Sequence, residues 1–103
     1  MQELITFLED NSRSRWITIG PMEVYVRKSI KNFLEIANVN VLPEHRNSGV
    51  FTKFLNTIEK MKPLSGIFIE NVMHERFAKF FKKRNYKEYK YGNEHPCFYL
   101  EHD

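Results

Sequence analysis

The segment VLPEHRNSGVFTKFL, residues 41–55, decides the fold. A β-branched, apolar stretch ends at Pro43, Arg46 follows, and three residues later Gly49 precedes a segment with the apolar spacing of an amphipathic helix. A helix that begins directly after a strand presents unpaired backbone N–H groups and the positive end of its dipole, and both favour an anion. Gly49 allows a ligand to approach the backbone closely, and Arg46 adds a charge suited to phosphate. The alternative is an ordinary strand-to-helix turn with Ser48 as N-cap.

Apolar periodicity predicts the elements on both sides of this junction. A strand, a helix and a strand follow one another in the middle of the chain, and this order implies a parallel pair inside a mixed, mostly antiparallel sheet. The predicted fold class is therefore α/β, with helices covering the sheet. The predicted elements are a helix over residues 2–10, three antiparallel strands between residues 15 and 42, a helix from Gly49 to Pro63, a strand over residues 66–72, a helix over residues 73–85, and strands over residues 86–91 and 96–100.

Each predicted helix has an apolar face at helical spacing, which we expect to point into the core. Asn85 follows the last helix and can take the left-handed conformation that ends a helix. The residues expected to point inward are Leu4, Ile5 and Leu8 in the first helix, Val50, Phe51, Phe54, Leu55, Ile58 and Met61 in the second, and Met73, Phe77, Phe80 and Phe81 in the third.

Composition and charge limit the class of protein. The 103 residues, 42% of them hydrophobic, suffice for one compact domain over residues 1–103 and are too few for two. No apolar run is long enough to span a bilayer, and acids stand near the N-terminus where a signal peptide carries bases. Cys97 is the single cysteine, which fits a reducing compartment, so we expect a cytoplasmic protein. The net charge of +3 suits an anionic ligand, although a modest excess of lysine is more often a solvated face.

Two stretches resemble motifs of the GNAT N-acetyltransferase superfamily. Residues 41–51 resemble its acyl-coenzyme A motif, in which Gln or Arg, two residues, Gly, one residue, and Gly or Ala follow a strand. Residues 71–86 resemble its second motif, N-E-R-A-x-x-x-Y-x-K-x-G-F, on a helix that follows a strand. The resemblance implies a small GNAT-like domain that binds acetyl-coenzyme A and transfers the acetyl group directly to an amine acceptor. An open acceptor face would suit a macromolecular amine such as a protein lysine.

The resemblance also implies where the cofactor binds. Its pyrophosphate would rest on backbone N–H groups of the loop before the second helix, and its pantetheine arm would pair with the end of the preceding strand. A backbone N–H of the Asn40 and Val41 region would polarise the thioester carbonyl. The complete set of predicted cofactor contacts is Val39, Asn40, Val41, Arg46, Asn47, Ser48, Gly49, Val50, Phe51, Thr52, Asn71, His74 and Phe81.

Two phenylalanines depart from the family pattern. Phe51 replaces the second Gly or Ala, so its ring must either leave room for the phosphates or point into the core. Phe81 occupies the position at which many members carry a tyrosine that protonates the departing thiolate. A thiol of pKa near 8.5 leaves as thiolate at pH 7 against only roughly 2 kcal/mol, so this acid is helpful but dispensable. Other candidates for the acid are Tyr89, Tyr91, Tyr99, Cys97 and water.

A general base matters more than an acid. Removing a proton at pH 7 from an amine of pKa near 10.4 costs roughly 4.6 kcal/mol before the nitrogen can attack. Glu35 lies eleven residues before Arg46 in the strand that leads into the first motif, a spacing that resembles the glutamate base of the histone acetyltransferase branch. Partial burial would raise the pKa of Glu35 toward the useful range. The alternatives are that Glu35 is an ordinary surface residue, or that His45 or His74 titrates in its place.

Two other classes of function remain open. A catalytically silent relative would keep the fold or the cofactor cleft to bind a partner protein, and the departures at Phe51 and Phe81 favour it. A nucleic-acid-binding module would combine a phosphate footprint with stacking tyrosines, although tyrosines at this alternation also pack ordinary strands. Its residues would be Lys79, Lys82, Lys83, Arg84, Lys87, Lys90, Tyr86, Tyr89 and Tyr91.

The other partner classes follow from what the sequence lacks. The segment around Cys97 has no second pair of zinc ligands, so no metal site is expected. We expect neither membrane nor nucleic acid as a partner, and the sequence is compatible with a homodimer.

Overall fold

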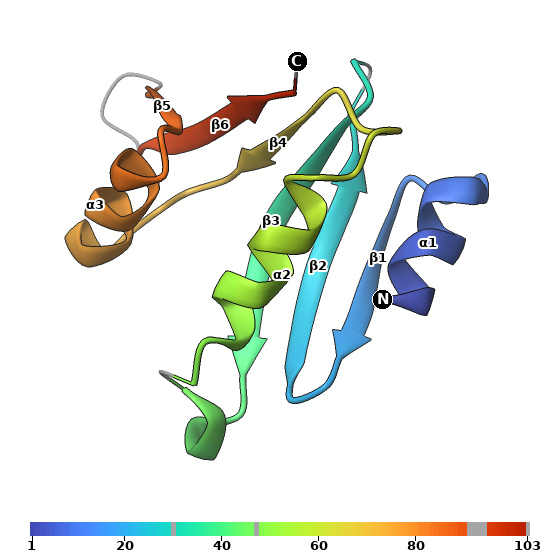
Figure 1. The fold of residues 1–103 in the computed structure, drawn as a ribbon, viewed down its shortest axis with the longest axis horizontal. Helices are drawn as coiled ribbons and strands as arrows, with labels where there is room; N and C mark the ends of the chain where they lie inside the picture. Colours follow the sequence, from blue (N-terminus) through green and yellow to red (C-terminus); the bar gives the residue numbers. More distant parts are fainter. Residues whose placement is uncertain (30, 47, 91–94, 103) are drawn as a thin grey trace.

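A computed structural model of the protein describes residues 1–29, 31–46, 48–90 and 95–102. Six strands form one sheet in the order β1-β2-β3-β4-β6-β5 (Figure 1). The elements are α1 (Gln2–Glu9), β1 (Ser14–Ile19), β2 (Met22–Lys28), β3 (Phe33–Val41), the short 3-10 helix η1 (Pro43–His45), α2 (Val50–Ile58), β4 (Gly66–Ile69), α3 (Glu75–Lys83), β5 (Lys87–Tyr89) and β6 (Cys97–Glu101).

The sheet has the predicted mixed pairing. β1, β2 and β3 form an antiparallel meander, and β3 pairs in parallel with β4. β4 then pairs with β6, and β6 with the edge strand β5, both antiparallel. Backbones with positive φ close the first two connections, at Gly20 (φ 57°) and Asn32 (φ 63°). The α/β class and the single parallel pair are therefore confirmed.

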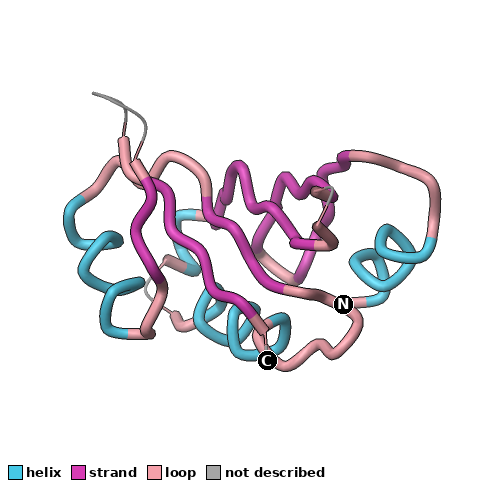
Figure 2. Tube along the Cα trace, turned by 90° about the horizontal axis from the view of Figure 1, so that it is seen from above, coloured by secondary structure: helices cyan, strands magenta, loops and turns pink. Residues whose placement is uncertain are grey.

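All three helices lie on the same face of the sheet (Figure 2). On each strand, alternate side chains point toward the helices and form one continuous buried cluster with helix residues. The side chains between them point to the other face and are mostly polar or aromatic. The expectation that helices cover the sheet therefore holds for one face only; within the described ranges, the second face has no helix over it. The core residues contributed by helices are Leu4 and Phe7 of α1, Phe54, Leu55 and Ile58 of α2, and Phe81 of α3.

β3 separates from β4 at a β-bulge. Tyr25 of β2 pairs with Asn38 while Val26 pairs with Ile36, which leaves Ala37 as an extra residue of β3. Ile36 is also the last residue of β3 in register with β4. Because a bulge bends its strand and increases the local twist, β3 turns away from β4 here. Residues 37–41 of β3 then have no strand of the described chain on the β4 side; we call this segment the free edge and the opening beside it the splay.

The structure corrects two predicted boundaries. α2 ends at Ile58, because the next residues form tighter turns before Pro63, with the N–H of Lys60 donating to the Thr57 carbonyl. β4 ends at Ile69, and soon afterwards Asn71 (φ 48°) leaves the extended conformation. The left-handed conformation predicted for Asn85 is confirmed, with φ 68°. Within the described residues no helix is both long enough and apolar enough to cross a membrane.

Two predicted inward faces were partly wrong. In α1, Leu4 and Phe7 are fully buried, whereas Ile5 is 38% exposed. The three-residue spacing of Leu4 and Phe7 therefore defines the inner face. At α3, Met73 is 67% exposed and Phe77 49% exposed. The helix begins only at Glu75, so Met73 precedes it, and Phe77 lies on the side of the first turn that faces away from the core.

Candidate active site

The free edge of β3 offers backbone groups to a ligand. The Leu42 N–H donates to the Pro21 carbonyl on the β2 side. Backbone groups of an antiparallel strand alternate between its two edges, so Val41 and Val39 direct their N–H and C=O groups away from β2, into the splay. The Nε–H of Arg46 donates to the Val41 carbonyl (3.2 Å), which agrees with this direction. Asn40 instead opposes Glu23 of β2.

The start of α2 lies next to this edge. Gly49 takes the N-cap position with φ 82°, and no side chain of the described residues caps the helix. The predicted Ser48 N-cap is therefore wrong, since the Ser48 hydroxyl instead donates to the His45 carbonyl within the loop. A Cβ built on Gly49 meets no atom within 4 Å, so open space lies above the loop. Asn47, a predicted cofactor contact, lies outside the described residues.

Phe51 and Phe81 both belong to the interface between α2 and α3. The Phe51 ring stands edge-on to Phe81, with centroids 6.3 Å apart, so it points into the core and leaves the loop side free. Phe81 is 2% exposed and stacks on Phe98 of β6 at 5.6 Å. A cofactor contact of Phe81 would therefore be confined to a very small surface. Asn71 and His74, the other predicted contacts of the second motif, are exposed before α3.

Glu35 lies on the uncovered face of the sheet, between Arg27 of β2 and Phe68 of β4 in register. Its side chain is half-buried. Burial raises the pKa of the Glu35 carboxyl, and a hydrogen bond with Glu70 and the charge of Glu70 add to this, while Arg27 opposes it. Glu35 is thus partly buried on an uncovered sheet face, and its role as a base stays a prediction. Glu35 is only one residue before Ile36, where β3 leaves β4, so this carboxyl stands beside the start of the splay.

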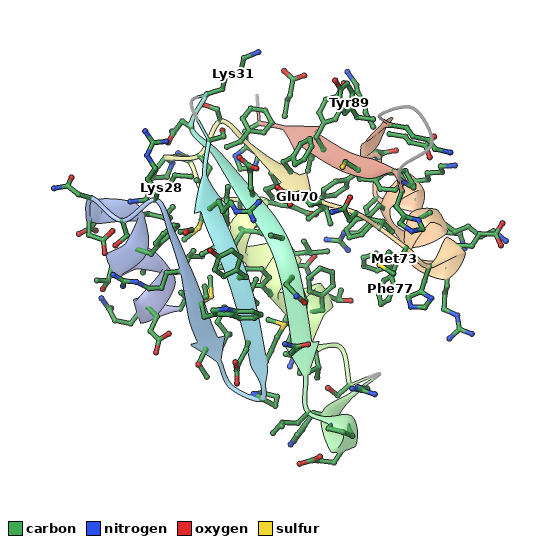
Figure 3. The ribbon with its side chains drawn as sticks, turned by 180° about the vertical axis from the view of Figure 1, so that it is seen from behind. Lys28, Lys31, Glu70, Met73, Phe77 and Tyr89 are labelled. Carbon is green, nitrogen blue, oxygen red and sulfur yellow. The ribbon has the colours of Figure 1, made fainter. Side chains whose placement is uncertain are left out.

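A broad cavity of about 950 Å³ covers this part of the uncovered face. Lys28 and Lys31 lie at its edge near the β2–β3 hairpin, Tyr89 near β5, and Glu70 between them (Figure 3). The volume is typical of a small-molecule site. Three of the proposed acids, Tyr89, Cys97 and Tyr99, line the same cavity as Glu35, whereas Tyr91 lies outside the described residues. The other lining residues are Arg13, Ser29, Phe33, Phe68, Asn71 and Glu101.

Sequence reasoning missed Arg27 and Glu70. The Arg27 Nη1 lies 2.8 Å from the Glu70 Oε1. The two residues are 43 positions apart. They meet only because β2 and β4 flank β3, so no local pattern points to the pair. The Glu70 N–H also donates to the Ile36 carbonyl (3.0 Å), which fixes the backbone that carries this carboxylate.

A second polar cluster ties α2 to the end of α3. Glu59 accepts hydrogen bonds from the Arg84 guanidinium (2.7 Å) and from the Tyr86 hydroxyl (2.7 Å). Tyr86 is only 4% exposed, and its burial together with the bond to Glu59 raises its pKa. This cluster removes Tyr86 from any stacking surface and engages Arg84 in an ion pair. The structure thus weakens the nucleic-acid hypothesis at two of its residues.

No protein-family model matches the chain, and no curated protein matches it in sequence. Solved structures match the chain in their fold. An acetyltransferase of the GNAT family from Staphylococcus aureus Mu50 superposes with a TM-score of 0.64 at 18% identity, over 98% of this chain and 75% of that one. The chain has the GNAT fold.

Two further structures with acetyltransferase names share the fold. A Bacillus subtilis acetyltransferase in complex with CoA has 15% identity and a TM-score of 0.63, over 97% of this chain and 83% of that one. The ribosomal-protein-S18-alanine N-acetyltransferase from Escherichia coli has 8% identity and a TM-score of 0.57, over 96% of this chain and 74% of that one. The GNAT fold therefore extends over nearly the whole chain, including both resembling motifs.

Proposed function

We propose that this protein is an acyl-coenzyme A-dependent N-acyltransferase, with acetyl-coenzyme A as donor and an amine as acceptor. The observation that carries the proposal is the position of Glu35. This half-buried carboxyl of raised pKa lies beside the point where β3 leaves β4, next to a free strand edge and a helix start without a side-chain cap. These three elements together suit acyl transfer to nitrogen: an edge for the donor, a site for phosphate and a base for the amine.

The donor would enter from the splay. Its pantetheine arm would bind along the free edge, where Val39 and Val41 offer N–H and C=O groups, in the manner of an added strand. The pyrophosphate would lie on the first-turn N–H groups of α2, with Arg46 within reach from the end of β3. Gly49 leaves open space for this approach. The N–H of Val39 or Val41 is then the donor available to polarise the thioester carbonyl.

The acceptor amine would come from the uncovered face, through the cavity that contains Glu35. Transfer would be direct, in a ternary complex, because Cys97, the cysteine of this cavity, is buried. The CoA-bound B. subtilis protein and the E. coli S18-alanine N-acetyltransferase share this fold, which supports a coenzyme A donor and an amine acceptor. A protein amine is one acceptor that an open face would admit.

A donor-binding experiment followed by an acceptor experiment tests the proposal. Acetyl-coenzyme A at about one hundred times its dissociation constant should stabilise the protein by roughly 2.7 kcal/mol and raise its melting temperature. Incubation with an amine should then release coenzyme A thiol and add one acetyl group to the amine, read by mass spectrometry. Failure of both readouts would contradict the proposal.

A coenzyme A-binding protein without catalysis is the second candidate function. The observation that favours it is Phe81, which has no hydroxyl and is enclosed by rings. Stabilisation by acetyl-coenzyme A without release of thiol in the presence of amines would identify this case.

A further inference from the structure

The floor of the cavity on the uncovered face is aromatic. Phe68 of β4 is in register with Tyr99 of β6, and both side chains are half-buried. Phe33 of β3 supplies a third ring, which lies across Gly66 of β4, since a Cβ built on that glycine would be 2.6 Å from two atoms of the ring. Residues two apart on a strand share one face at a spacing of about 6.6 Å, so the Phe33 ring and Phe68 are neighbours over β4.

These three rings do not pack against other rings. On the same face of the sheet, Trp16 and Tyr25 pack with their ring centroids 5.2 Å apart. Within the described ranges, no ring pair of this kind includes Phe33, Phe68 or Tyr99, and none of the three belongs to the buried core cluster. Rings prefer an offset or edge-on aromatic partner, so an aromatic ligand in this cavity gains contacts that the three rings do not make with the chain.

The aromatic floor begins close to the point where the proposed function puts the thioester. Ile69 is in register with Ile36, the last paired residue of β3, so Phe68 lies one residue from the start of the splay. Neighbouring strands are about 4.8 Å apart, so a nitrogen beside β3 would be about 5 Å from a ring that rests over β4. A linker of about two or three carbon atoms covers this distance. Lys31 and Glu101 add polar groups to the cavity lining, and apolar walls with a few polar groups are the usual mixture in small-molecule sites.

We propose that Phe33, Phe68 and Tyr99 form a subsite for the acceptor, which selects a primary amine whose nitrogen is joined to an aromatic ring by two or three carbon atoms. This inference rests on the proposed function and names the substrate class of the same site. The ring of the acceptor lies on the aromatic floor while its nitrogen reaches the splay. The nitrogen of the neutral amine attacks the thioester carbonyl carbon, the C–S bond breaks with its electron pair on sulfur, and one proton moves from nitrogen to sulfur, which gives an N-acetylated arylalkylamine and coenzyme A thiol.

Two amines that differ only in the ring test the subsite, with acetyl-coenzyme A as donor. Wild-type protein should use 2-phenylethylamine with a kcat/KM at least about a hundredfold above that of ethylamine. The difference should lie mainly in KM, because the ring makes the same contacts in the ground state and in the transition state. A saturated ring of the same size, in 2-cyclohexylethylamine, should be used less efficiently than the aromatic ring.

Phe68→Leu and Trp16→Leu form a matched pair of variants. Phe68→Leu keeps an apolar side chain but removes the ring, so the preference for 2-phenylethylamine over ethylamine should fall about tenfold. The difference in pKa between the two amines cancels in this comparison, since both proteins meet the same amines. Trp16→Leu removes an aromatic side chain from the same face, 44% exposed and outside the cavity lining, and should leave the preference unchanged.

Binding of 2-phenylethylamine without the donor supplies a readout that needs no turnover. In a nitrogen-15 NMR titration, the amides of Phe33, Phe68 and Tyr99 should shift saturably, and those of α1 should not. Equal use of 2-phenylethylamine, ethylamine and 2-cyclohexylethylamine, with no shifts at these amides, would overturn this inference and leave the proposed function intact. Saturable shifts without transfer to any amine would keep the aromatic site and contradict the proposed function, whereas neither binding nor transfer would overturn both.

Discussion

Replacing Gly66 by alanine should destabilise the sheet at the point where β3 meets β4. A Cβ at Gly66 would lie 2.5 Å from the Leu100 carbonyl oxygen and 2.6 Å from two atoms of the Phe33 ring. Ordinary contact begins at 3.4 Å, so the Leu100 oxygen would have to retreat by 0.9 Å. That oxygen belongs to the backbone of β6, whose ladder with β4 resists such a shift. Overpacking of this kind costs about 1–3 kcal/mol, offset by about 0.4–1 kcal/mol because alanine restricts the unfolded chain.

The net loss, about 1.3 kcal/mol from the middle of both ranges, should appear as a lower midpoint in urea with an unchanged slope, and as a melting temperature lower by about 4–8 °C per kcal/mol. Ser65→Ala, at the exposed neighbouring position, is the matched control and should stay within about 0.5 kcal/mol of wild type. Phe33→Leu in the Gly66→Ala background should recover part of the loss, because it removes the ring from the contact. A Gly66→Ala protein as stable as Ser65→Ala would refute this reasoning about the packing of β4.

Three further changes test the site and its support. Glu35→Gln should lower turnover about 10²-fold or more without changing cofactor affinity. The folded-state pKa of Glu35 is raised, so its contribution to the free energy of unfolding is fully present below the unfolded pKa of about 4.5 and is lost as pH rises through the folded pKa. Glu35→Gln should therefore gain stability relative to wild type as pH rises from acid to neutral, as urea titrations would show. Gly49→Asn tolerates the left-handed backbone but places a side chain in the open space, so calorimetry should find weaker acetyl-coenzyme A binding at an unchanged melting temperature. Gly49→Val should weaken binding and also strain the loop. An unchanged affinity in both variants would contradict the placement of the phosphates. Tyr86→Phe should cost about 1 kcal/mol of unfolding free energy, because it removes the hydrogen bond from the Tyr86 hydroxyl to Glu59 while Arg84 still pairs with that carboxylate. A change below about 0.3 kcal/mol would show that the hydroxyl is dispensable.

The order of helices and strands could be predicted because each depends on local spacing. The apolar periodicity of residues 50–58 and the branched stretch before Pro43 identify α2 and β3 without reference to distant residues. The parallel pair then follows from the strand–helix–strand order. The strand that carries Glu35 was predictable, whereas its partial burial was not, because a glutamate that alternates with apolar residues equally suits an exposed sheet face.

The remaining features depend on contacts that cross the sheet. The bulge at Ala37 arises from the register of β2 against β3, and the Arg27–Glu70 pair from three adjacent strands. Met73 was expected inside because apolar spacing does not reveal where a helix begins, and α3 begins two residues later. That all three helices occupy one face, which leaves the face of Glu35 open, follows from the joint packing of the core.

The central claim is that coenzyme A binds in the splay, between the free edge of β3 and the start of α2. A nitrogen-15 NMR titration with coenzyme A tests it most directly, because each backbone amide reports its own contact. The account predicts saturable shifts concentrated at Val39, Val41 and residues 50–52, with the amides of α1 unchanged. Saturable shifts centred on α1 and β1, or no shifts at millimolar coenzyme A, would contradict it.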